Sequence, residues 1–140
     1  MPNPNTVTAA LVVIGEEILS GRTEDANIAY LAAYLTRIGI LLREVRVVRD
    51  IEDEIVAAVN ALRARYTYVF TTGGIGPTHD DVTTDAIAKA FGVEVVTDPE
   101  AVAAMRKRFS EQELTSARLR MARIPAGASL IDNAISRAPG

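Results

Sequence analysis

The stretch Phe70-Thr-Thr-Gly-Gly-Ile-Gly-Pro-Thr-His-Asp-Asp-Val-Thr-Thr-Asp85 decides the fold of this chain. Its order predicts a strand that runs into a glycine loop and then into a helix whose first turns are acidic. A glycine-rich turn lets backbone N–H groups approach an oxyanion, and the N-terminus of the helix adds about half a positive charge. The stretch therefore predicts a site for a phosphate-bearing ligand. Its three aspartates indicate that a cation or an acid/base step is also involved.

The glycine loop matches neither of two common nucleotide-binding loops. A P-loop requires Gly-Lys followed by Ser or Thr, whereas Gly76 is followed by Pro77 and Thr78. The dinucleotide fingerprint requires a third glycine where this chain has His79, and it normally follows the first strand. The simpler alternative is that the glycines only make a tight turn. The threonines and aspartates in the same loop favour a functional site over that alternative.

The same plan of strand, loop and helix occurs twice before this stretch. Short apolar or β-branched runs predict the strands, and apolar residues spaced three or four apart predict the helices. The expected elements are a strand over Ala9–Ile14, a helix with Ile28, Leu31, Leu35 and Ile38 on its apolar face, a strand over Ile40–Val48, and a helix marked by Ile55, Val59 and Leu62.

The third unit and the segments after it continue this alternation. We expect strands over Tyr66–Thr72, Val93–Val96 and Ser129–Ile131, and helices from about Val82 to Phe91, from Pro99 to about Phe109, and around Leu114–Met121. Asp98 followed by Pro99 is typical of a helix N-cap. Alternating strands and helices predict an α/β fold with a mostly parallel sheet covered on both faces.

Length and composition limit what the chain can be. With 140 residues and 49% hydrophobic content, we expect a flexible lead-in over residues 1–6 and a single domain over 7–140. A net charge of −3 with interspersed charges argues against nucleic acid as a partner. The absence of cysteine excludes thiolate chemistry, and no apolar run is long enough for a membrane span. A cytoplasmic protein with a small-molecule partner is the expectation.

In open α/β sheets, ligands bind beyond the carboxyl ends of the strands. The loops Gly15–Asn27, Arg49–Asp53 and Gly73–Asp85 are the three that meet this condition. Asp81 and Asp85 would share a helix face if the helix begins near Asp81, and such a pair suits Mg²⁺, which takes one or two carboxylates plus phosphate oxygens and water. Helix capping is the alternative for both aspartates. Asp50 follows a strand, where N-capping worth about 1 kcal/mol is the alternative to a functional role.

Taken together, the three loops resemble the molybdopterin-binding domain of molybdenum cofactor biosynthesis proteins, and within that superfamily the N-terminal domain of competence/damage-inducible protein A. The resemblance covers nearly the whole chain. Its matching segments are Gly15-Glu-Glu-Ile-Leu-Ser-Gly-Arg-Thr-Glu-Asp25 with Asn27, Val47-Val-Arg-Asp50, and Thr71 through Asp85. The first two motifs are short, whereas the third is long and distinctive.

The resemblance implies a three-layer α/β/α sandwich and a homo-oligomer. In the cofactor-assembly branch, aspartates matching Asp50 and Asp81 serve the adenylylation of molybdopterin with Mg²⁺ and ATP, which makes these two residues the expected catalytic carboxylates. The expected metal ligands are Asp81 and Asp85, and the ligand is a molybdopterin or an adenine nucleotide. The expected ligand-binding residues are Gly15, Glu16, Glu17, Ser20, Thr72, Gly73, Gly74, Ile75, Gly76, Pro77, Thr78 and His79.

Two alternatives to this function stay open at the level of the sequence. The competence-protein branch is associated with metal-dependent hydrolysis of ADP-ribose, so the chain can be a nucleotidyl transferase or a pyrophosphatase if it is an enzyme. It can also be a non-catalytic oligomeric binding or scaffold domain. Two departures from the family bear on activity: Glu16 stands where a shorter Asp or Asn is common, and the chain stops at Ala138-Pro139-Gly140, so that we expect the final strand to be lacking.

Overall fold

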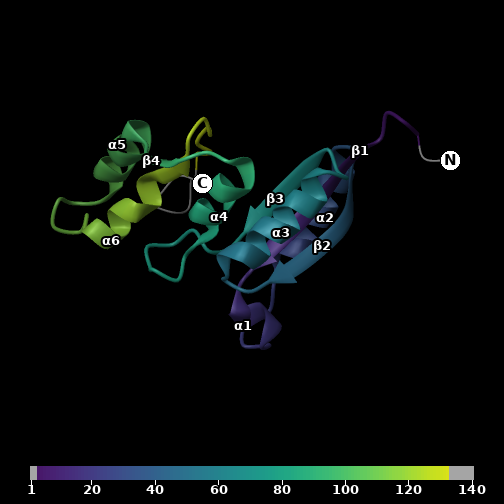
Figure 1. Cartoon of the computed structure of the whole chain (residues 1–140), viewed down its shortest axis with the longest axis horizontal. Helices are drawn as coiled ribbons and strands as arrows, with labels where there is room; N and C mark the ends of the chain where they lie inside the picture. The colour runs from purple at the N-terminus through teal and green to yellow at the C-terminus, as the bar shows by residue number, and fades with distance from the viewer. Residues whose placement is uncertain (1–2, 133–140) are drawn as a thin grey trace. The chain divides into compact units, whose positions relative to one another are not determined.

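The computed structural model describes residues 3–132 of the chain. It divides into two compact units, unit 1 over Met1–Gly73 and unit 2 over Gly74–Gly140. Figure 1 shows the elements of each unit, and the two units are described one at a time. The prediction of a single domain over 7–140 stays a prediction. The expected lack of a final strand concerns residues outside the described range.

Unit 1 is built on a three-stranded parallel sheet in the order β2-β1-β3. Its strands are β1 (Val7–Ile14), β2 (Ile40–Val48) and β3 (Tyr68–Thr72), and its helices are α1 (Glu16–Leu19), α2 (Asn27–Arg37) and α3 (Glu52–Arg63). The central strand β1 forms the core of the unit, since every side chain from Ala9 to Ile14 is at most 2% exposed. The run of six apolar residues there is typical of a strand buried on both faces.

The strand order makes unit 1 a three-layer sandwich. From β1 the chain crosses to β2 through α2, and from β2 it returns past β1 to β3 through α3. Because parallel crossovers are right-handed, this reversal places α2 and α3 on opposite faces of the sheet. Figure 1 shows α3 lying across the sheet. The predicted α/β/α sandwich with a mostly parallel sheet is confirmed.

Unit 2 contains a helix-rich fold around a two-stranded antiparallel sheet. Its elements are α4 (Thr83–Phe91), β4 (Val95–Thr97), α5 (Pro99–Arg108), α6 (Ser116–Leu119), the 3-10 turn η1 (Arg120–Ala122) and β5 (Arg123–Pro125). Ala101, Met105 and Ala122 form its buried cluster. The predicted cap at Asp98 is confirmed, since its carboxylate accepts a hydrogen bond from Ala101 N–H at 3.0 Å.

One expected strand is absent, one helix was not expected, and the start of α4 decides where Asp81 lies. Residues Ser129–Ile131 form no strand, and the strand of this region is β5, which pairs with β4. The short helix α1 was not predicted, because four residues carry too little periodicity to reveal it. Helix α4 begins at Thr83, so Asp81 lies before it rather than in its first turn. Among residues 3–132, no helix has both the length and the apolar content needed to cross a membrane.

Candidate functional site

The carboxyl ends of the strands in unit 1 are joined by the loops that follow them. Gly15 N–H donates to Val48 C=O at 2.9 Å, which links the end of β1 to the end of β2. The Asp50 carboxylate accepts a hydrogen bond from Glu16 N–H at 3.2 Å. Helix α3 has Ile51 as its N-cap and no side-chain capping bond. The capping alternative for Asp50 is therefore wrong, and its carboxylate holds the first loop instead.

Gly73 brings the end of β3 against the end of β1. A Cβ atom at Gly73 would lie 2.1 Å from the carbonyl oxygen of Ile14, and the residue has a φ of +91°. Side chains do not fit that space, and they rarely adopt that backbone conformation. Gly73 is therefore required for the close approach of the two strand ends.

A pocket of about 290 Å³ opens at this edge of unit 1. Its polar lining comes from the loop after β1 and from the end of β3 and includes Glu17, Thr23, Asp25, Asn27 and Thr72. The carboxylate of Glu17 lies over Gly15, where a Cβ would come within 2.6 Å of its Oε1. The Asp25 carboxylate is engaged, because it accepts from Ile28 N–H at 2.8 Å in the first turn of α2.

Asp81 organises the glycine loop of unit 2. Its Oδ2 accepts from the Thr78 N–H at 2.9 Å and from the Thr78 hydroxyl at 2.7 Å. A Cβ at Gly76 would lie 2.8 Å from the same oxygen. The loop is tied to α4 by Thr83 N–H, which donates to Gly74 C=O at 3.1 Å. Asp81 therefore stabilises the loop and does not cap α4, whose N-cap is Val82.

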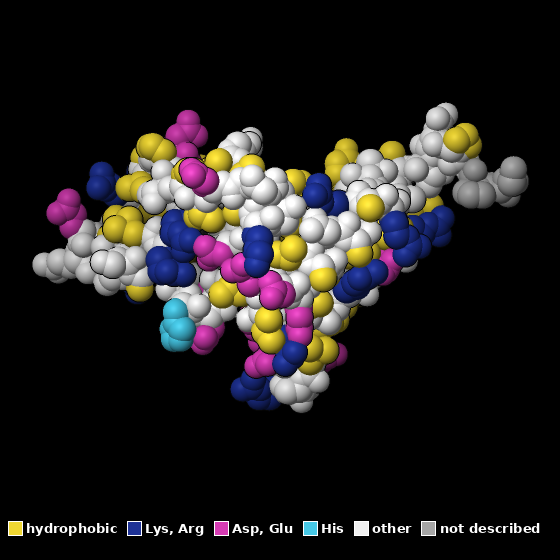
Figure 2. Space-filling view, in the orientation of Figure 1, with side chains coloured by type: hydrophobic (Ala, Val, Ile, Leu, Met, Phe, Trp, Pro, Cys, Tyr) yellow, Lys and Arg dark blue, Asp and Glu magenta, His cyan; other side chains and the backbone are white. Residues whose placement is uncertain are grey.

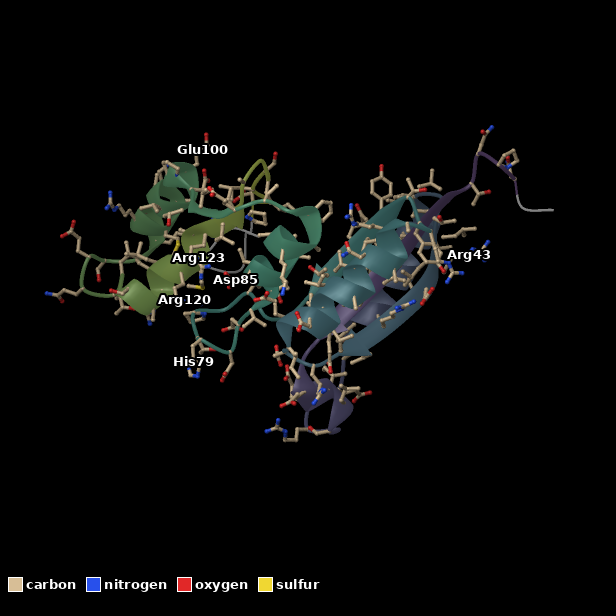
Figure 3. All side chains as sticks on the ribbon, in the orientation of Figure 1. Arg43, His79, Asp85, Glu100, Arg120 and Arg123 are labelled. Carbon is tan, nitrogen blue, oxygen red and sulfur yellow. The ribbon has the colours of Figure 1, made fainter. Side chains whose placement is uncertain are left out.

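Asp85 forms an ion pair that sequence reasoning missed. Its Oδ1 lies 2.5 Å from Nη2 of Arg123 on β5, and the two side chains are 33% and 25% exposed. Figure 3 shows the two residues facing each other in unit 2. Arg123 stands 38 positions later in the chain, so no short-range pattern could have revealed it. Because α4 begins at Thr83, the condition for Asp81 and Asp85 to share a helix face is not met.

The remaining predicted site residues differ in their exposure and in their hydrogen-bond partners. Ser20 is exposed, and its hydroxyl donates to Glu17 C=O at 3.3 Å. Ile75 is 56% exposed. The His79 side chain is 92% exposed and lies 3.3 Å from the Asp80 carboxylate; Figure 2 shows it standing out from the surface of unit 2. His79 and Ile75 are therefore accessible to a ligand.

Arg49, the neighbour of Asp50, was not a predicted site residue. Its guanidinium makes a close ion pair with Glu54 in the first turn of α3, and its backbone N–H donates to the same carboxylate at 3.3 Å. The bond from Arg49 lowers the pKa of Glu54. Arg49, the basic residue next to Asp50 in the sequence, is therefore paired with Glu54.

The predicted residues fall into two sets. Unit 1 brings together Gly15, Glu16, Glu17, Ser20, Asp50, Thr72 and Gly73, and unit 2 holds Gly74, Ile75, Gly76, Pro77, Thr78, His79, Asp81 and Asp85. That the two sets act on one ligand stays a prediction. In the described part of the chain, no three His, Asp or Glu side chains gather closely enough to hold a metal ion by themselves.

Comparison with protein families gives one match over most of the chain. The model of a probable molybdopterin binding domain matches residues 10–135. A protein from Pyrobaculum calidifontis is 39% identical over 135 residues, which are 95% of this chain and 52% of that protein. A protein from Thermoplasma acidophilum is 38% identical over 132 residues, 94% of this chain and 52% of its own length. The chain thus spans about half the length of the curated relatives it matches.

Solved structures give the same result for the fold. The protein CinA from Thermoplasma acidophilum, described as having unknown function, superposes with a TM-score of 0.90 at 38% identity, over 97% of this chain and 80% of that one. The tungsten cofactor synthesizing protein MoaB from Pyrococcus furiosus superposes with a TM-score of 0.58 at 22% identity, over 78% and 66% of the two chains. At that identity the second similarity concerns the fold alone.

Proposed function

This chain belongs to the molybdopterin-binding domain family, and on that premise we propose that it binds a phosphate-bearing pterin or adenine nucleotide together with a divalent ion such as Mg²⁺. The observation that carries the proposal is the polar pocket at the strand ends of unit 1, where Gly15, Asp50 and Gly73 hold the loops in place. In α/β sheets this edge is where ligands bind.

The glycine loop is the proposed phosphate cradle. Thr72 and Gly73 line the pocket, and the loop continues from them without interruption. Gly73 and Gly74 both have positive φ, at 91° and 68°. Glycines let backbone N–H groups approach an anion closely, and the loop leads into the N-terminus of α4. Both features favour a phosphate group over a neutral ligand.

Asp81 is the better supported of the two proposed metal ligands. Its Oδ2 is engaged by Thr78, and among the described residues its Oδ1 has no hydrogen-bond partner. The carboxylate of Asp85 is already paired with Arg123. A site with only one or two protein ligands suits Mg²⁺, because this ion keeps several water ligands and also binds oxygens of the substrate phosphates. A bound Mg²⁺ would offset negative charge on the phosphate groups.

Asp50 is the proposed acid or base. The bond from Glu16 N–H keeps its carboxylate at the strand ends, and the residue is partly buried. The family resemblance leaves two reactions open, nucleotidyl transfer and hydrolysis of a pyrophosphate. Both can use proton transfer by a positioned carboxylate. We also propose that the protein is cytoplasmic, forms a homo-oligomer and has no nucleic-acid partner.

The first test replaces Asp81 by Asn and uses Asp85→Asn as the matched control. We expect Asp81→Asn to abolish the Mg²⁺-dependent part of pyrophosphate or nucleotide binding, measured by calorimetry, while the thermal unfolding curve without ligand is retained. Asp85→Asn should cause the smaller loss of binding, because that carboxylate is paired with Arg123. If Asp81→Asn binds with the wild-type affinity and the wild-type dependence on Mg²⁺, Asp81 is not the metal ligand.

Product analysis separates the possible activities. Incubation with ADP-ribose and a divalent ion yields AMP if the chain is a pyrophosphatase, and incubation with ATP and molybdopterin yields pyrophosphate if it is a nucleotidyl transferase. Thermal stabilisation by the ligand without product in either assay indicates a binding or scaffold domain. Absence of both product and stabilisation contradicts the proposed function.

A further inference from the structure

Among the described residues, the pocket in unit 1 contains one half-buried carboxylate that no hydrogen bond of the protein engages. Asp25 is bonded to Ile28 N–H, and Glu24 is exposed. Glu17 is half-buried and lines the pocket, and no hydrogen bond within residues 3–132 reaches its carboxylate. Both of its oxygens would come within 3 Å of a Cβ at Gly15, so the missing side chain of that glycine is what makes room for them.

The rest of the pocket suits a flat ring. Apolar side chains contribute part of its lining, among them Val13, Ile14, Ile18 and Ala26. A volume of about 290 Å³ is near the lower end of the range for small-molecule sites. A planar heterocycle can cover apolar side chains with its faces and present its polar edge to a single group. Phosphate itself is disfavoured beside Glu17 because the two would carry charge of the same sign.

We infer that Glu17 selects a ring that presents two adjacent N–H donors, the 2-amino-4-oxo edge of pterins and guanine, over an adenine ring. This inference rests on the proposed function and decides between the two ligand classes that it leaves open. An ionised carboxylate is an acceptor only, and its two oxygens match two parallel donors. The N3–H and 2-amino group of a pterin supply such a pair, as do N1–H and the 2-amino group of guanine.

Adenine cannot make the same pair of bonds. Its corresponding edge has one donor, the 6-amino group, beside the lone pair of N1. That lone pair would face a carboxylate oxygen, so that one acceptor opposes another. A site built around donor recognition rejects a ring lacking the donors, because its own polar group is then left without a partner.

Three nucleotides that differ only in the base test the inference. GMP, IMP and AMP carry the same ribose and phosphate, and their edges opposite Glu17 offer two donors, one donor, and a donor beside an acceptor. With Mg²⁺ present, we expect GMP to bind wild-type protein about tenfold tighter than AMP, with IMP between them. Glu17→Gln should bring the GMP and AMP affinities together, because an amide offers one acceptor in place of two. Glu24→Gln, in the same pocket but exposed, should keep the wild-type ratio.

The outcomes distinguish this inference from the proposed function. Equal binding of GMP and AMP by wild-type protein would overturn the inference and leave phosphate binding standing. A preference for GMP that persists in Glu17→Gln would also overturn it, once unfolding curves show that the variant is folded. If wild-type protein binds none of the three nucleotides and no pyrophosphate, the proposed function fails and this inference fails with it.

Discussion

At the scale of single residues, the glycines of the site are defined by what occupies the space of their missing side chains. The Glu17 carboxylate lies over Gly15, the Asp81 carboxylate over Gly76, and the Ile14 carbonyl oxygen over Gly73. In each case an oxygen lies within 3 Å of the position that a Cβ would take. Among these three positions, only that of Gly73 requires glycine for a second reason, its backbone freedom. Only there does φ lie in the left-handed region.

Replacing Gly73 by Ala tests this explanation, with Gly21→Ala as its control. Both glycines have positive φ, at 91° and 77°, but a Cβ at Gly21 would have no atom within 4 Å. Both variants should lose stability to backbone strain, and Gly73→Ala should lose more than about 1 kcal/mol beyond the control because of the Ile14 contact. Urea denaturation measures both losses. Equal losses would show that the close approach to Ile14 is unimportant.

Asp50 and Asp81 show how far residue types can be interpreted without a structure. Their positions after a strand and after a glycine loop made them candidates, with helix capping as the alternative. The structure removes that alternative for both, because Asp50 accepts from Glu16 N–H and Asp81 from Thr78. Those partners depend on where α3 and α4 begin, and helix boundaries are the least certain feature of a pattern.

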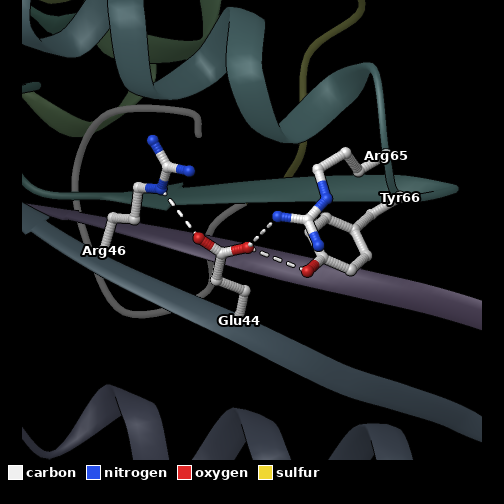
Figure 4. Close-up of polar contacts among 4 residues, drawn as sticks. All are labelled: Glu44, Arg46, Arg65 and Tyr66. Atoms are coloured by element: carbon white, nitrogen blue, oxygen red, sulfur yellow. Dashed lines mark hydrogen bonds and ion pairs between the residues drawn. The ribbon is translucent and has the colours of Figure 1, made fainter.

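At the scale of elements, an ion-pair cluster ties β2 to the junction between α3 and β3. The Glu44 carboxylate accepts from Arg46 Nε at 2.8 Å, from the Tyr66 hydroxyl at 2.8 Å and from Arg65 Nη1 at 3.2 Å, as Figure 4 shows. Glu44 is the register partner of Ala10 on the central strand β1. The bonds from Arg46 and Tyr66 lower the pKa of Glu44, and the bond to Glu44 raises the pKa of Tyr66.

This cluster predicts a defined dependence of stability on pH. Because the folded-state pKa of Glu44 is below its ordinary value of 4.5, its contribution is fully present above about pH 4.5 and is lost as the pH falls through the lower folded value. Glu44→Gln should therefore be less stable than wild type at pH 7, and the difference should shrink as the pH falls below 4.5. Urea denaturation across this range measures it.

An exposed glutamate of unit 2 provides the control for this experiment. Glu111→Gln should follow the wild-type curve of stability against pH. A difference between wild type and Glu44→Gln that stays constant from pH 7 to below pH 4 would mean that ionisation of Glu44 does not stabilise the junction. The mutation would then act only through packing.

At the scale of the whole molecule, the assembly state is a prediction that rests on the family likeness alone. The resemblance implies a homo-oligomer, and we predict that sedimentation equilibrium will give a mass that is a multiple of the protomer mass. Since association obeys mass action, the weight-average mass should fall toward that of one chain on dilution. A single-chain mass at every concentration would contradict the prediction.

The sequence by itself determined the family, the α/β class and most elements of both units, because these depend on local patterns. Apolar periodicity marked α2 and α3, apolar or β-branched runs marked β1 to β3, and Asp98 marked the start of α5. Only the tertiary structure decided that β5 pairs with β4, that Gly73 meets Ile14, and that Arg123 holds Asp85. These contacts join residues far apart in the chain. Strand register and chain crossovers bring them together, and no spacing along the sequence encodes that arrangement.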